Sequence, residues 1–129
     1  MTAEVLALLG GDPGRLAIFE AFEGAVLSCG ESAMRVSKTQ ISWGSPYLFA
    51  MLSLPRRAAD RRSGALLATL GLNRRLDSPR VLQAVEPYPG RWTHHLLLTR
   101  PEEVDGELRT WLAEARAFAL AKGRKSGPK

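Results

Sequence analysis

The segment RWTHHLLLTRPEEVDGELRTWLAEARAFAL, residues 91–120, is the most informative part of the sequence because its apolar pattern changes period within it. Residues 91–99 follow a Pro/Gly turn and include the unbroken apolar run 96–98, which is typical of a β-strand. Beyond them, apolar side chains recur at helical spacing, at Val104, Leu108, Trp111, Leu112, Ala115 and Phe118. The stretch therefore predicts one strand followed by one long amphipathic helix.

Local signals at the start of this helix agree with the spacing. Thr99 and Glu102 stand as in a capping box, and Pro101 lies in the first turn. Glu103 and Asp105 add negative charge at the positive end of the helix dipole. We therefore expect the helix to begin close to Thr99.

A second long helix is predicted over residues 12–29. Asp12 is suited to cap it, Pro13 suits its first position, and Gly30 suits the position just past its last turn. One side of the segment is apolar, with Ile18, Phe19, Phe22, Val26 and Cys29. The preceding segment AEVLALL, residues 3–9, favours a short additional helix.

The middle of the chain has the pattern of strands. Residues 34–43 and 47–55 flank the turn signal at 44–46 and predict a β-hairpin. The charged segment 56–64 is typical of a connection, and ALLATLGL, residues 65–72, predicts a third strand. Together with residues 91–99, the sequence predicts four strands.

The segment LDSPRVLQAVEPYPG, residues 76–90, favours a short helix before the last strand. Asp77 or Ser78 is suited to cap it, Pro79 to its first position and Pro87 to its end. The resulting order predicts an α+β fold in two layers. We expect a mostly antiparallel four-stranded sheet with two long helices on one face.

The composition fits one domain. The chain has 129 residues, of which 45% are apolar and 24% charged. Four of its 18 basic residues lie in KGRKSGPK, residues 122–129, and removing them leaves 14 against 13 acidic residues. We therefore expect a nearly neutral domain over residues 1–121 and a basic, flexible tail over 122–129, which favours a solubilising terminus over a phosphate-binding arm.

Cysteine usage and hydropathy bear on the compartment. Cys29 is the single cysteine, so an internal disulfide is excluded and a reducing environment is favoured. Residues 1–15 lack the basic start of an export signal, and no segment is apolar enough to span a bilayer. We expect a cytoplasmic protein without a membrane partner.

Four segments together resemble a known family: VSKTQISW, GLNRRLDSPR, AVEPYPGRWTHHLLL and PEEVDGELRTWLAEA, in this order and spacing. They are similar to a bacterial domain family of unknown function, over roughly residues 4–121. Its members stand alone in small proteins or occupy the C-terminal end of some predicted transport proteins. The resemblance implies a fold group and no activity.

The adjacent histidines are separated by the geometry of a strand. Neighbouring side chains point to opposite faces, so His94 shares a face with Trp92 and Leu96, and His95 with Arg91 and Thr93. The pair cannot chelate one metal ion as neighbours, and one cysteine does not suffice for a structural zinc site. We expect His94 to be packed in the core and His95 to be half-exposed.

Alternation in the other strands extends the face of His95. If the registers agree, one side of the sheet carries a polar floor and an aromatic wall, with Lys38, Gln40, Tyr47, Thr69, Arg91 and His95. Arg75 and Arg80 extend its rim. This mixture suits a site for a polar or anionic ligand, although the solvated face of an antiparallel sheet has the same composition.

The leading hypothesis is a non-catalytic binding or interaction domain whose polar face holds an anionic or polar small molecule or a protein partner. No catalytic residue, metal or cofactor is assigned, and a homodimer stays open. One alternative is a small hydrolase with His95 as acid/base. Another is weak nucleic-acid binding through the basic tail and the loop arginines Arg56, Arg57, Arg61 and Arg62.

Overall fold

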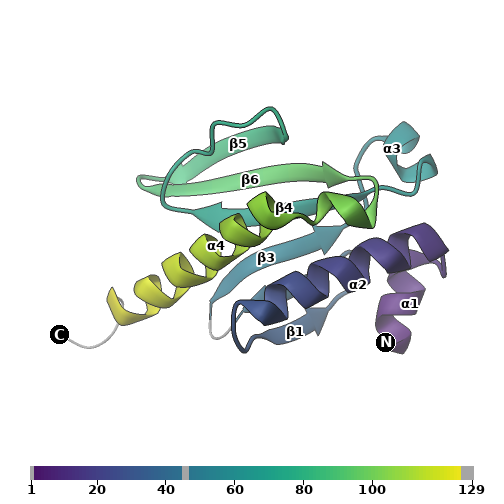
Figure 1. Cartoon of the computed structure of the whole chain (residues 1–129), viewed down its shortest axis with the longest axis horizontal. Helices are drawn as coiled ribbons and strands as arrows, with labels where there is room; N and C mark the ends of the chain where they lie inside the picture. The colour runs from purple at the N-terminus through teal and green to yellow at the C-terminus, as the bar shows by residue number, and fades with distance from the viewer. Residues whose placement is uncertain (1, 45–46, 126–129) are drawn as a thin grey trace.

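The fold is an antiparallel sheet with helices packed against one of its faces (Figure 1). The computed structural model describes residues 2–44 and 47–125, the last four of them by backbone only. The six strands lie in the order β1-β2-β3-β4-β6-β5 and pair antiparallel throughout. Their bounds are β1 Ala33–Val36, β2 Gln40–Gly44, β3 Leu48–Ser53, β4 Leu66–Leu72, β5 Val81–Tyr88 and β6 Arg91–Leu98.

The described residues also form four α-helices and one 3-10 turn. These are α1 Ala3–Leu9, α2 Pro13–Ser28, α3 Ala58–Arg62, η1 Pro101–Glu103 and α4 Gly106–Lys125. The α+β class and the antiparallel sheet are confirmed, whereas the expected number of strands and the details of the helices are not. The division into a domain over 1–121 and a tail over 122–129 stays a prediction.

The segment 76–90, for which the sequence favours a helix, contains β5 instead. Apolar residues at helical spacing, among them Val81, Leu82 and Val85, are compatible with the expected helix, but pairing with β6 holds the segment extended and leaves most of it exposed. The strand pairs with β6 through a turn at Pro89 and Gly90, where Gly90 has a φ of 75°. The chain tolerates Pro87 in this strand because β5 lies at the edge of the sheet, where one row of backbone groups has no ladder partner.

The segment 34–43, for which the sequence predicts one strand, is divided between β1 and β2. The hydroxyl of Ser37 accepts hydrogen bonds from the backbone N–H groups of Thr39 and Gln40, which closes a tight turn. The hairpin of β2 with β3 is present as predicted. Residues 45–46 of its expected turn lie outside the described residues.

The start of α4 also differs from expectation. Glu103, not Glu102, binds Thr99: its carboxylate accepts from the backbone N–H and the hydroxyl of that residue. This pairing closes the 3-10 turn, and α4 begins later, where Asp105 accepts a hydrogen bond from the N–H of Leu108 at 3.0 Å. The capping residues of this segment therefore serve two consecutive helical segments instead of one.

Strand register separates the two faces row by row. Trp43, Ala50, Leu70 and His94 lie in one lateral row, and all four side chains are buried. From α2, Phe19 and Phe22 pack on Trp43 with ring centroids 6.1 Å and 5.4 Å away. Helix α4 covers β3 and β4 on the same face. The apolar positions of both long helices therefore meet this face of the sheet.

His94 is the polar member of the buried row. Its side chain is fully buried, and its Nε2 accepts a hydrogen bond from the backbone N–H of Leu76 at 2.9 Å. An accepting Nε2 carries no proton, so the imidazole is neutral in this arrangement. Burial lowers the pKa of His94 below its ordinary value of 6.5.

This environment predicts acid-sensitive stability. The folded state binds a proton at His94 less readily than the unfolded chain does. The contribution of neutral His94 to the free energy of unfolding is therefore complete above pH 6.5 and is lost as the pH is lowered below that value. We expect the melting temperature to drop between pH 7 and pH 5. His94→Gln keeps an acceptor for Leu76 and should flatten this dependence, whereas the control His95→Gln should leave most of it. Equal pH profiles for wild type and His94→Gln would contradict this role.

Candidate functional site

The face of the sheet opposite the long helices, here called the open face, carries the candidate site. Its central row contains Ser42, Met51, Thr69, His95 and Gln83, one from each of five neighbouring strands. Thr69 and His95 face each other across β4 and β6. The Thr69 hydroxyl and Nδ1 of His95 form a hydrogen bond of 3.0 Å, so two of the residues expected from the sequence are in direct contact.

The imidazole of His95 has one nitrogen to offer a ligand. Nδ1 is bound to Thr69, while Nε2 has no hydrogen-bond partner among the residues that the structure describes. Burial lowers the pKa of His95, and the positive charge of Arg56 lowers it further. The side chain is therefore neutral at pH 7 and lies within the field of an arginine from a different segment.

That arginine belongs to a pocket at one end of the open face. The pocket measures about 430 Å³. Its floor consists of Leu67 and Leu97, and the loop before α3 contributes Arg56 and Arg57 to its wall. The complete lining is Pro55, Arg56, Arg57, Asp60, Leu67, Leu82, Gln83, His95 and Leu97.

The loop arginines have two different tasks. Arg61 turns inward and donates from Nη1 to the carbonyl oxygens of Pro55 and Arg56, at 3.0 Å and 2.6 Å. Arg15 of α2 donates to the carbonyl oxygen of Arg61 and so ties the loop to the helical layer. Among the described residues, neither Arg56 nor Arg57 has a side-chain hydrogen bond or ion pair. The bracing by Arg61 thus holds two guanidinium groups at the pocket that are available to a ligand.

Arg91 and Gln40 lie on the open face, away from this pocket. Arg91 is four residues before His95 on β6, and its guanidinium lies 5.8 Å from the ring centroid of Tyr88. Gln40 begins β2 and faces the same side as Ser42. The structure thus places four sequence candidates on one face, of which Thr69 and His95 are in contact.

Lys38 lies away from the open face, and Tyr47 does not line the pocket of Arg56. Lys38 is at the tip of the turn between β1 and β2, and it lines a separate pocket of about 460 Å³ together with Glu4, Ala7 and Leu8 of α1. Tyr47 precedes β3 and is partly exposed. The structure does not bring Lys38 together with His95, because the division of the segment into β1 and β2 moves the lysine out of the strand.

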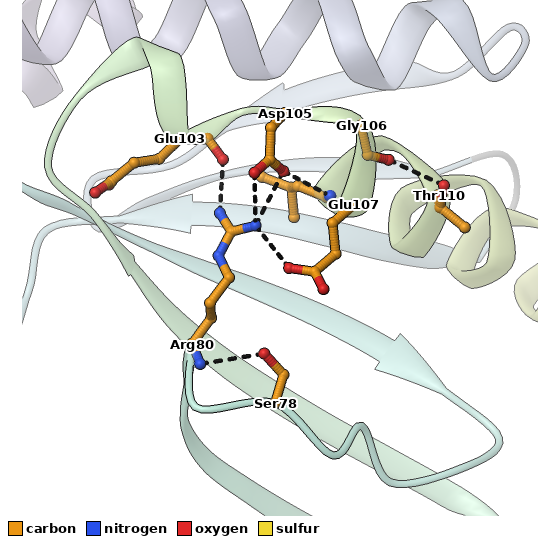
Figure 2. A network of polar contacts seen from close by, with 8 residues as sticks. Ser78, Arg80, Glu103, Asp105, Gly106, Glu107 and Thr110 are labelled. Atoms are coloured by element: carbon orange, nitrogen blue, oxygen red, sulfur yellow. Dashed lines mark hydrogen bonds and ion pairs between the residues drawn. The ribbon is translucent and has the colours of Figure 1, made fainter.

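Arg75 and Arg80 are bound to other parts of the fold. The guanidinium of Arg75 lies 5.9 Å from the ring centroid of Trp92. Arg80 reaches the start of α4, where it donates to Asp105 at 2.9 Å, to Glu107 at 3.0 Å and to the backbone carbonyl of Glu103 (Figure 2). It also lies 5.7 Å from the ring centroid of Trp111. These contacts give Arg80 a role in holding β5 against α4.

Among the described residues, His95 takes part in neither of two arrangements that are common in catalytic sites. A histidine base usually has a carboxylate that orients its second nitrogen, and none is hydrogen-bonded to His95 among the described residues. No cluster of three His, Cys, Asp or Glu side chains suited to a metal ion occurs within residues 2–44 and 47–121. None of the described helices has the length and apolarity needed to cross a membrane.

The sequence contains only partial signals for three residues of the pocket that were not among its predicted ligand-binding residues: Arg56, Arg57 and Gln83. Arg56 and Arg57 stand out as a basic loop, but only the folded chain places that loop at the end of the open face. Gln83 is hidden in the sequence because its segment favours a helix. In an alternating strand it falls on the same face as His95.

Comparisons with known proteins give a family and no activity. The family model described as "Domain of unknown function (DUF5655)" matches residues 10–119. No curated protein and no solved structure matches the chain.

The contacts of Arg80 at the start of α4 are expected to stabilise the fold more than the ion pair of Arg74 with α4 does. We expect Arg80→Gln to lower the free energy of unfolding by about 1–2 kcal/mol, the low end for charge-assisted hydrogen bonds because the carboxylates are half-exposed. The control Arg74→Gln removes an exposed ion pair with Glu114 on the same helix and should cost less. Chemical denaturation measures both. Equal losses would show that the contacts of Arg80 stabilise the fold no more than an exposed ion pair does.

Proposed function

The chain belongs to the DUF5655 family of unknown function, and we propose that it is a non-catalytic binding domain that holds a small anionic ligand on its open face. The observation that carries this proposal is the pair of guanidinium groups of Arg56 and Arg57, beside Nε2 of His95, all without partners among the described residues. These donors stand over an apolar floor. The proposed ligand is therefore anchored by charge and packed by leucine side chains.

The chemistry of the pocket suits a carboxylate or phosphate. Guanidinium groups match the geometry of such groups by paired N–H donors, and they stay charged at every physiological pH. With His95 neutral, the two arginines and the single carboxylate of Asp60 leave the lining with a formal charge of +1. Leu67, Leu82 and Leu97 supply the apolar area from which most of the affinity of a small ligand comes.

The rest of the basic surface does not favour nucleic acid as the partner. Arg61 is turned toward backbone carbonyl groups, which takes one cation out of the basic loop. The residues that line the pocket, within the part of the chain that the structure describes, include no Phe, Tyr or Trp ring on which a base would stack. The small pocket with an apolar floor fits a compact ligand better than a charged polymer.

Benzoate, a carboxylate on an apolar ring, is the probe for this proposal. We expect it to bind, and we expect Arg56→Gln or Arg57→Gln to weaken its Kd about tenfold, which corresponds to the loss of about 1.4 kcal/mol. Calorimetric titration measures the Kd, and melting curves verify the fold. Arg62→Gln is the matched control, because Arg62 is an exposed arginine of α3 that does not line the pocket. If Arg62→Gln weakened the binding of benzoate as much as Arg56→Gln does, the loop would attract anions by its overall charge and not through a defined site.

The histidine adds a pH dependence to the same binding. A bound anion favours the protonated imidazole, and burial lowers the pKa of free His95 below 6.5, so the affinity for benzoate should rise as the pH is lowered below 6.5. His95→Gln should remove this rise and retain the binding due to the arginines. The measurement is the same titration at several pH values above the pKa of benzoate. An unchanged pH dependence in His95→Gln would remove this residue from the site.

A further inference from the structure

A second hollow lies on the far side of the Thr69–His95 pair from the pocket of Arg56. Beyond that pair, the open face continues along β4 and β6 to Gly71 and Thr93, which are register partners. A second pocket of about 240 Å³ lies there, and its lining includes Thr69. His95 lines the first pocket and Thr69 lines the second, so the hydrogen-bonded pair lies between them.

Gly71 creates the second hollow. It lies inside β4, where a side chain on the open face would be expected, and a Cβ at this position would meet nothing within 4 Å. On the open face the hollow is lined by Phe49, Met51 and Thr93, and at the end of the sheet its lining also includes Trp92 of the opposite face and Phe118 of α4. This part of the face therefore offers space and apolar area to an occupant.

Charge is unequal along the two pockets. At the first, Arg56 and Arg57 are free of partners among the described residues, whereas at the second the guanidinium of Arg91 already lies over the ring of Tyr88. From Leu97 to Thr93 the strand advances roughly 13 Å, at about 3.3 Å per residue. An occupant of both pockets would need an anionic head and an extended apolar part.

We propose that the ligand is an aliphatic chain with one anionic head group. The head lies at Arg56 and Arg57, and the chain crosses the Thr69–His95 pair and fills the hollow at Gly71. This inference rests on the proposed function, because it takes the anion site as given and adds the class of molecule that occupies it. The head is defined by its charge and geometry, so a carboxylate and a phosphate ester of the same chain are equivalent members of the class.

The test is a series of carboxylates of increasing length: butanoate, octanoate and dodecanoate, each below its micellar concentration. Burial of each methylene contributes about 0.8 kcal/mol, so the affinity should rise about fourfold per methylene until the hollow is filled. Gly71→Val should remove most of the gain between butanoate and dodecanoate and leave the Kd of butanoate unchanged. Valine is favoured in strands, and the φ of Gly71 is not positive, so the fold is expected to be kept.

Two further variants make the result decisive. Gly71→Ala fills less of the hollow and should remove a smaller part of the gain. It also serves if the valine variant does not fold. Gly24→Ala is the control, because its added Cβ would likewise meet nothing within 4 Å but lies on α2.

The possible failures separate the two proposals. If no carboxylate binds, butanoate included, the proposed function is wrong. If butanoate binds in an Arg56-dependent manner but longer chains gain nothing, or their gain survives in Gly71→Val, the anion site stands and the aliphatic ligand is overturned. A diacid, dodecanedioate, that binds more tightly than dodecanoate and loses this advantage in Arg91→Gln would show a ligand with two anionic ends and overturn the single head group.

Discussion

The pleat of the antiparallel sheet determines which side chains enter the core and which line the open face. Because successive side chains of a strand point to opposite faces, two neighbouring histidines receive opposite environments. His94 enters the core and accepts a hydrogen bond from the backbone of Leu76, while His95 faces the open side and binds the hydroxyl of Thr69. A shift of the register by one residue would exchange these environments and place apolar leucines in solvent.

The helical layer makes the open face possible by covering only one side of the sheet. The apolar stripes of α2 and α4 meet the face of Trp43 and Leu70, so the other face is not needed to form the core. A protein of this size buries enough apolar surface in one such layer to fold. The central row of the second face is therefore free to carry polar side chains, and Thr69, which is buried there, is hydrogen-bonded to His95.

Elements with a clear periodic pattern of apolar residues can be predicted from the sequence. Features that depend on contacts between distant segments cannot. The long helices and the placement of His94 and His95 follow from spacing alone. Segment 76–90 favours a helix because its Asp-Ser-Pro start resembles a cap, while its pairing with β6 is a tertiary contact. Arg56 joins the site because Arg61 and Arg15 hold its loop, which no local pattern reveals. Lys38 leaves it because a tight turn closed by the Ser37 hydroxyl divides the strand.

Strand β5 is an edge strand whose backbone disfavours pairing with a strand of another molecule. It exposes Leu82, Val85 and Tyr88, side chains that would favour assembly if the strand were also straight and rich in free N–H groups. Instead the strand has two register irregularities, and Pro87 has no N–H to donate. Pro87, which in the sequence resembles the end of a helix, therefore hinders the addition of a further strand to β5. The protein can expose apolar side chains at this edge without promoting strand-by-strand aggregation.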